Sequence, residues 1–199
     1  MDRLFVRLVL YVLRFAGAVA GVWGVAYAVN GATQAEGVMT VRVVPRPEVA
    51  DRLGLSGVRL PGGVSPGGGE LSLRVWDSTA AEQVLTRADV MVGGLCALVA
   101  ARLLGGLLTS VFEGEPYRRG NAARVAWLAV LALVSGAAQA LPGLAVGAVL
   151  DRTGVSGTFG PAFGLSWVPF AGAAFLLALA LALRAGRRAS PAQTAAAGS

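Results

Sequence analysis

The sequence predicts an all-α membrane protein, a four-transmembrane-helix bundle with a small β-containing extracytoplasmic segment between the first and second helices. Composition is the first reason, because 55% of the 199 residues are hydrophobic and only 14% are charged, whereas about 25% of an average soluble domain is charged. The second is a set of four apolar stretches, each close to the roughly 20 residues that cross a bilayer as a helix. They lie at residues 9–29, 90–112, 125–149 and 165–183. We expect one membrane domain over residues 1–188 and a disordered tail over 189–199.

Arginines mark the ends of these stretches and predict the orientation. They precede or enter the first stretch, separate the second from the third and follow the fourth: Arg3, Arg7, Arg14, Arg118, Arg119, Arg124, Arg184, Arg187 and Arg188. Short cytoplasmic segments carry such an excess of basic residues. Both termini and the second connection are therefore expected in the cytoplasm. Because all 17 basic residues are Arg and Ala and Gly abound, we expect a multi-pass protein of a bacterial cytoplasmic membrane.

The first stretch has two readings. Ala26-Tyr27-Ala28, after an apolar run and upstream arginines, is similar to a signal-peptidase site, and cleavage after Ala28 would leave three helices in the same orientation. Trp23 and Tyr27 also fit the aromatic belt at a membrane interface. We favour a retained helix and keep cleavage as the alternative.

Residues 30–87 are polar enough to leave the membrane. Apolar residues alternate at 38–44 and 71–76, which predicts two strands, while the Pro and Gly residues of 61–63 and 66–69 indicate turns. Thr79 and Glu82 form a capping-box pattern, and the helix that they begin is expected to run unbroken into the second stretch. With fewer than sixty residues, this segment is expected to lean on the membrane helices for its core.

Two features concern helix packing. Gly17-x-x-x-Gly21 has the small-residue spacing at which transmembrane helices approach closely. Pro142 should kink the third helix, because proline removes a backbone donor. Residues 150–164 are expected to form a turn-rich outer connection.

The composition excludes most catalytic chemistry. The chain has no His, no Lys and a single cysteine, Cys96, so imidazole-based metal or haem sites, an intramolecular disulfide, a Ser-His triad and a lysine Schiff base are impossible. The arginines do not form one basic face interleaved with exposed aromatics, as nucleic-acid binding requires. We therefore predict a protein that is not an enzyme, holds no cofactor or metal and binds no nucleic acid directly.

Arg102 is the most unusual single residue, because it falls midway along the second stretch. A charge at that depth costs at least about 2.5 kcal/mol, and no Asp or Glu lies in any of the four stretches. Gln139 and Ser135 of the third stretch are its expected partners, which makes these three residues a candidate intramembrane polar site. Anion binding is the functional hypothesis, and a structural arginine bonded to Gln139 and to carbonyls is the alternative that we favour.

The connection before the third stretch carries a motif. The motif consists of Gly114, Pro116 and Tyr117, then Asn121 after three intervening residues, and then Arg124 three positions further on. Gly114 permits a tight helix exit, Pro116 stops the helix, and Asn121 is a good N-cap. A rigid hairpin explains these residue types more simply than a docking site does.

The same residues resemble the bacterial membrane family called domain of unknown function 2975, in which Gly-x-Pro-Phe precedes an Asn and a basic residue; here Tyr117 replaces Phe. The layout of four stretches with a β-containing segment after the first is also similar. Members of that family are often encoded beside a small helix-turn-helix transcriptional regulator. The resemblance implies a non-enzymatic regulatory or accessory membrane protein that partners such a regulator. The alternative is a small transporter or channel for an anionic or apolar substrate with Arg102 in the pathway.

Overall fold

The computed structural model of the chain describes residues 3–52, 70–115, 117–118 and 120–196. The described chain is mostly helical, which confirms the predicted class at this level. Four helical segments are long and apolar enough to cross a membrane, and they run over Leu4–Ala32, Ala88–Phe112, Asn121–Arg152 and Val168–Gly186. Each covers or nearly covers one of the four predicted stretches.

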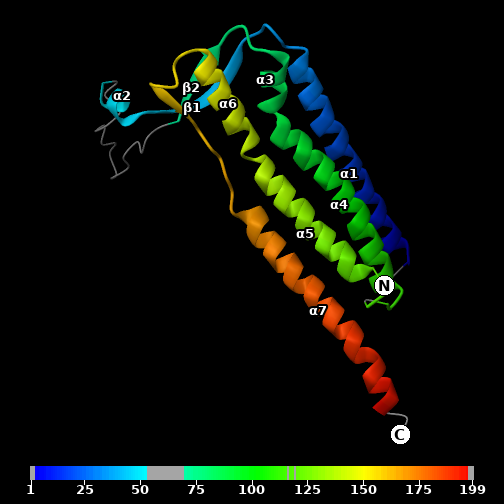
Figure 1. Cartoon of the computed structure of the whole chain (residues 1–199). Helices are drawn as coiled ribbons and strands as arrows, with labels where there is room; N and C mark the ends of the chain where they lie inside the picture. The colour runs from blue at the N-terminus through cyan, green and yellow to red at the C-terminus, as the bar shows by residue number, and fades with distance from the viewer. Residues whose placement is uncertain (1–2, 53–69, 116, 119, 197–199) are drawn as a thin grey trace, which may run out of the picture. The chain divides into compact units, whose positions relative to one another are not determined.

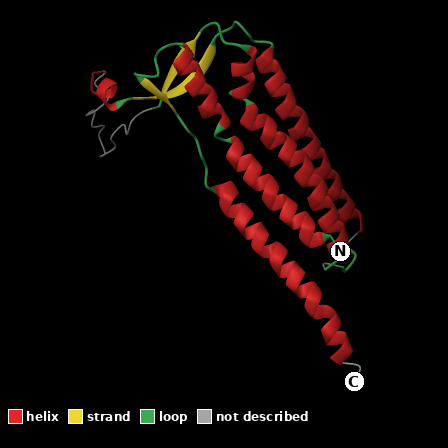
Figure 2. Cartoon of the chain, viewed as in Figure 1, coloured by secondary structure: helices red, strands yellow, loops and turns green. Residues whose placement is uncertain are grey.

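The elements follow one another along the chain as coloured in Figure 1 and classified in Figure 2. In order they are α1 (Arg3–Ala32), β1 (Met39–Pro45), α2 (Pro47–Arg52), β2 (Leu71–Val75), α3 (Ala80–Leu85), α4 (Ala88–Phe112), α5 (Asn121–Ala138), α6 (Leu141–Arg152), β3 (Phe159–Pro161) and α7 (Val168–Ala196).

The chain folds as two compact units, whereas the sequence predicted a single domain. We call them the helical unit (Met1–Val25, Val90–Ala138 and Ser166–Ser199) and the sheet unit (Ala26–Asp89 and Gln139–Leu165). The physical reason is that the sheet unit has an apolar core of its own, to which α6 contributes half.

That core lies between α6 and a three-stranded antiparallel sheet of order β2-β1-β3. The predicted strands are confirmed, because β1 pairs with β2 from Met39 opposite Val75 to Val43 opposite Leu71. Alternate residues of β1 point inward and pack against the helix, so that the buried cluster is Met39, Val41, Val43, Val146, Val149 and Leu150. The β-containing segment therefore shares its core with α6, which forms the C-terminal part of the predicted third stretch.

β3 was not predicted, and neither was α2. Residues 159–161 pair with the end of β1, where Val43 lies opposite Pro161 and Pro45 opposite Phe159. Three residues that include a glycine and a proline carry no alternation that would indicate a strand. Only tertiary pairing makes this segment a strand.

The helix after the capping box does not run unbroken into the second stretch, so that prediction was wrong. The capping box itself is confirmed, since Thr79 and Glu82 exchange both hydrogen bonds. α3 ends at Leu85, because the Thr86 hydroxyl contacts the carbonyls of Glu82 and Gln83 at 3.0 Å and the Arg87 N–H bonds to Val84 rather than one residue further back. Such a tightened turn ends a helix, and α4 begins at Ala88.

The third stretch is interrupted, not kinked. α5 ends at Ala138 and α6 begins at Leu141, which puts Pro142 in the first turn of α6. A proline ring clashes with the carbonyl four residues earlier, and that residue is Ala138, the last of α5. The proline therefore separates two helices, and its missing N–H costs nothing at the start of the second.

In the helical unit, α1 packs closely on α4 (Figure 1). A Cβ built at Gly17 would meet Ala101, and one built at Gly21 would lie 3.1 Å from the Cβ of Leu98. Gly17-x-x-x-Gly21 therefore serves packing within this unit, as the spacing predicts. On the other side of the unit, Gly136 of α5 lies against Pro169 and Phe170 of α7.

α7 continues to Ala196, whereas a disordered tail was expected from residue 189. The added residues are rich in alanine, the strongest helix former. The turns predicted within residues 61–69, Pro116 and residues 197–199 lie outside the described residues.

Candidate functional site

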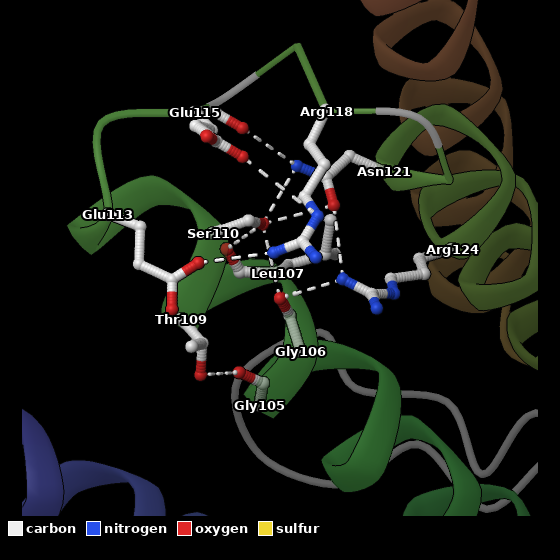
Figure 3. A network of polar contacts seen from close by, with 10 residues as sticks. All are labelled: Gly105, Gly106, Leu107, Thr109, Ser110, Glu113, Glu115, Arg118, Asn121 and Arg124. Atoms are coloured by element: carbon white, nitrogen blue, oxygen red, sulfur yellow. Dashed lines mark hydrogen bonds and ion pairs between the residues drawn. The ribbon is translucent and has the colours of Figure 1, made fainter.

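The hairpin that joins α4 to α5 is held by a buried polar pair, Ser110 of α4 and Asn121 of α5. The Asn121 amide nitrogen donates to the Ser110 hydroxyl at 2.8 Å (Figure 3). Both side chains are almost fully buried, with 1% and 2% of their surface exposed. The hydroxyl also lies 2.9 Å from the Leu107 carbonyl, to which it can donate. Buried polar groups that satisfy one another fix a single geometry.

Arg124 joins this network from α5. Its Nη1 donates to the Gly106 carbonyl at 2.8 Å and to the Asn121 side-chain oxygen at 3.1 Å. Gly106 makes this possible, because a Cβ built there would lie 3.0 to 3.3 Å from the guanidinium atoms. Gly106 and Ser110 were not among the predicted site residues. The signal was a Gly-Gly pair at 105–106, followed by a serine one turn later.

α4 ends in a tight turn at Gly114, as the sequence predicts. This glycine has a φ of +79°, its N–H bonds to the Val111 carbonyl, and the Glu115 N–H bonds to the Ser110 carbonyl at 2.9 Å. These two bonds form the Schellman motif that closes many helices. The tight helix exit predicted for Gly114 is confirmed.

Asn121 is not the N-cap that the sequence suggested. α5 begins at Asn121 itself, and the Arg124 N–H bonds to the carbonyl of Gly120 at 2.9 Å. Gly120, with a φ of +105°, therefore stands at the capping position. The Asn121 side chain reaches back to Ser110, because the hairpin is short enough for α4 to offer it a buried partner.

The outer side of the hairpin is polar and exposed. Arg118 pairs with Glu113 at 3.2 Å and approaches Glu115 at 3.9 Å, and all three side chains are more than half exposed. Such ion pairs contribute at most about 1 kcal/mol to stability. Tyr117 is 49% exposed and its ring lies over Gly186 of α7. The buried pair thus fixes a hairpin whose aromatic and charged side chains remain available to a partner.

Arg102 does not meet the predicted partner Ser135. Gly106 lies against Arg124 and Gly93 lies near Ser135, whose hydroxyl is 3.8 Å from a Cβ built at Gly93. Ser135 therefore lies beside Gly93, and Gly93 is nine residues from Arg102 along α4. Nine helical residues span roughly 13 Å along the helix axis. The sequence shows that Ser135 lies in the third stretch, but it does not show the axial register between that helix and α4.

Arg102 instead faces α1. With Arg14, Ala18, Leu98 and Ala101 it lines a cavity of about 420 Å³. Both arginines are exposed.

Gln139, the other predicted partner, belongs to the sheet unit. There it lines a cavity of about 300 Å³ together with polar side chains of β1, the α3–α4 turn and α4; these are Thr40, Arg42, Thr86 and Asp89. The sheet unit also has a two-pronged ion pair, in which Arg152 Nε and Nη2 donate to the two carboxylate oxygens of Glu82 at 2.8 and 3.0 Å; the Arg152 side chain is 41% exposed and that of Glu82 12%. Burial by itself would raise the pKa of Glu82, but the hydrogen bonds from Arg152 and from the Thr79 backbone outweigh it and lower that pKa.

Among the described residues, no group of three or more His, Cys, Asp or Glu side chains is placed to hold a metal ion. The described chain thus belongs to the class of mostly helical proteins. It has four helical segments of membrane-spanning length and a small sheet. No family model, no curated protein and no solved structure matches this chain.

Proposed function

We propose that this chain is a non-enzymatic regulatory or accessory protein of a bacterial cytoplasmic membrane, which docks a cytoplasmic partner on the hairpin between α4 and α5. The four apolar helices support a multi-pass membrane placement, and the arginine distribution supports cytoplasmic termini and a cytoplasmic hairpin. The sheet unit then lies on the outer side, where its cavity is suited to a small polar signal.

The single observation that carries this proposal is the construction of the hairpin. Ser110 and Asn121 are buried to the last few per cent, while Arg118 and Tyr117 are exposed beside them. The buried pair holds the exposed side chains of the hairpin in one geometry. A surface that presents charges in a fixed geometry is what electrostatic recognition requires, because rigid charges set register and partner choice.

The proposed partner is a small helix-turn-helix regulator encoded beside this gene. The reason is the motif Gly114-x-Pro116-Tyr117 with Asn121 and Arg124, through which the chain resembles a membrane family often encoded beside such regulators. Holding a regulator at the membrane would control its access to DNA without any chemistry by the membrane protein.

Liposome flotation tests this proposal. The purified regulator should float with liposomes that contain the wild-type protein, and Arg118→Glu should weaken that binding about tenfold, since reversal of an interface charge costs roughly 1.4 kcal/mol or more. Arg74→Glu is the control, because Arg74 is an exposed arginine of β2 that does not line the cavity, and it should leave flotation unchanged.

Two results would contradict the docking proposal. One is a regulator that does not float with the wild-type protein. The other is equal loss of flotation with both variants, which would mean that the regulator responds to net charge rather than to the hairpin. Circular dichroism of each variant in detergent shows beforehand that the helices are intact.

A further inference from the structure

Two arginines of the helical unit share one cavity. Arg14 of α1 and Arg102 of α4 line it together with three apolar side chains. Arg14 also lines a second cavity, of about 210 Å³, whose other residues are Arg7, Leu10 and Tyr11. Three arginines therefore follow one another along the same side of α1 and α4.

The packing of the two helices explains why Arg14 and Arg102 come together. Gly17 lies against Ala101, and a Cβ built at Gly105 would be 3.8 Å from Nε of Arg14. The Arg14 guanidinium thus rests on α4 at Gly105, three residues from Arg102. A Cβ there would touch Arg14 at an ordinary van der Waals distance.

The two arginines also lie at matching depth. Arg102 is ten residues from the end of α4 at Phe112, and Arg14 is ten residues from Leu4 near the start of α1. Ten helical residues span about 15 Å. In the membrane placement proposed above, Arg102 lies near the middle of the bilayer with Arg14 beside it, and Arg7 lies about two turns closer to the inner surface.

Among the residues that the structure describes, none compensates these charges. Within the described residues, Arg14 and Arg102 form no hydrogen bond or ion pair, and α1, α5, α7 and the part of α4 from Val90 onward contain no Asp or Glu. Each arginine at that depth costs at least about 2.5 kcal/mol. Two guanidinium groups in one cavity also repel each other, so an anionic ligand from outside the chain would stabilise both.

We propose that Arg14 and Arg102 together bind one phosphate-type oxyanion within the membrane. Arg7 would contact the anion first as it enters from the inner surface. Two planar guanidinium groups can each form paired hydrogen bonds with the oxygens of one phosphate. The same chemistry is offered by the phosphodiester of an anionic lipid headgroup and by free inorganic phosphate. This inference rests on the proposed membrane placement and is independent of docking at the hairpin.

The test uses the full-length protein purified in an uncharged detergent, after resistance to alkaline carbonate has shown that it is an integral membrane protein in cells. One arm titrates dioleoylphosphatidylglycerol and counts bound lipids by native mass spectrometry, with dioleoylphosphatidylcholine as the uncharged-headgroup comparison. The other arm measures binding of radiolabelled inorganic phosphate. Binding in the first arm alone identifies a lipid site, and binding in the second identifies a free anion.

The variants are Arg14→Gln, Arg102→Gln and the pair. Each single change should weaken binding about tenfold in the responsive arm, since a charge-assisted paired contact is worth roughly 1.4 kcal/mol or more. Arg184→Gln is the matched control, because it removes an exposed arginine of α7 outside the cavity, and it should change binding less than twofold. Arg102→Lys keeps the charge but not the planar fork, so it should also bind more weakly while preserving the fold.

The inference is overturned if a carbonate-resistant protein binds neither probe, or if the double variant binds as well as the wild type. Release of the protein by carbonate would instead contradict the membrane placement itself. The two failures are thus distinguishable.

Discussion

Glu82→Ala is expected to open the sheet unit, with a loss of about 3 kcal/mol in its stability. The Glu82 carboxylate holds Arg152 through two short hydrogen bonds and also accepts the Thr79 N–H at 2.8 Å. Charge-assisted bonds of a mostly buried group contribute about 1.5–3 kcal/mol, and loss of a cap costs about 1 kcal/mol. Hydrogen exchange of the β1 amides in detergent measures the change.

Glu70→Ala is the control for this variant, because Glu70 is an exposed carboxylate of the same unit at the start of β2. It should alter exchange by less than about 0.5 kcal/mol. Equal exchange rates for Glu82→Ala and Glu70→Ala would contradict the structural role given to Glu82.

The same ion pair predicts a pH dependence of the sheet unit. The folded state lowers the pKa of Glu82 from its ordinary 4.5, so the carboxylate stabilises the unit at neutral pH. That contribution is lost as the pH falls through the lowered pKa, because the unfolded state then binds the proton more readily. Glu82→Gln should flatten this part of the acid dependence of β1 exchange.

Gly94→Ala should lower the stability of the helical unit by about 1–3 kcal/mol, as overpacking does. Gly94 is buried in α4, and a Cβ built there meets the carbonyl of Ala20 and lies 3.2 Å from Cα of Gly24. These are backbone atoms of α1, so no side chain can move aside and the helices must separate. Thermal unfolding in detergent, followed by tryptophan fluorescence, measures the effect.

The neighbouring glycine supplies a matched control. A Cβ built at Gly93 has only the Ser135 hydroxyl near it, at an ordinary contact of 3.8 Å. Gly93→Ala should therefore be neutral or raise stability by up to about 1 kcal/mol, because alanine favours the helix. If both alanines raise the unfolding temperature equally, close packing at Gly94 is not what joins α1 to α4.

Much of the fold follows from local sequence. Apolar length predicts where the four helical segments lie, alternation predicts β1 and β2, and Thr79 with Glu82 predicts the start of α3. Gly114 predicts the end of α4, since its positive φ is a property of a single residue. In each case the residues that carry the signal are neighbours along the chain.

The rest depended on contacts between distant segments. β3 exists only because β1 offers it an edge, and α5 and α6 are separate helices because Pro142 conflicts with the carbonyl of Ala138. The partner of Arg102 was predicted wrongly for the same reason: the register between α4 and neighbouring helices is set by Gly17, Gly94 and Gly106, which the apolar pattern does not distinguish. A candidate site assembled from two helices needs that register first.

Cysteine accessibility tests most directly whether the apolar helices cross a membrane with the hairpin inside and the sheet unit outside. In a Cys96→Ala background, Ser72→Cys reports on an exposed position of β2 and Arg118→Cys on the exposed hairpin. With a membrane-impermeant maleimide, Ser72→Cys should be labelled in intact spheroplasts and Arg118→Cys only after the membrane is opened. Labelling of Arg118→Cys from the outside, or of Ser72→Cys only after opening, would contradict the proposed topology and with it the docking of a cytoplasmic partner.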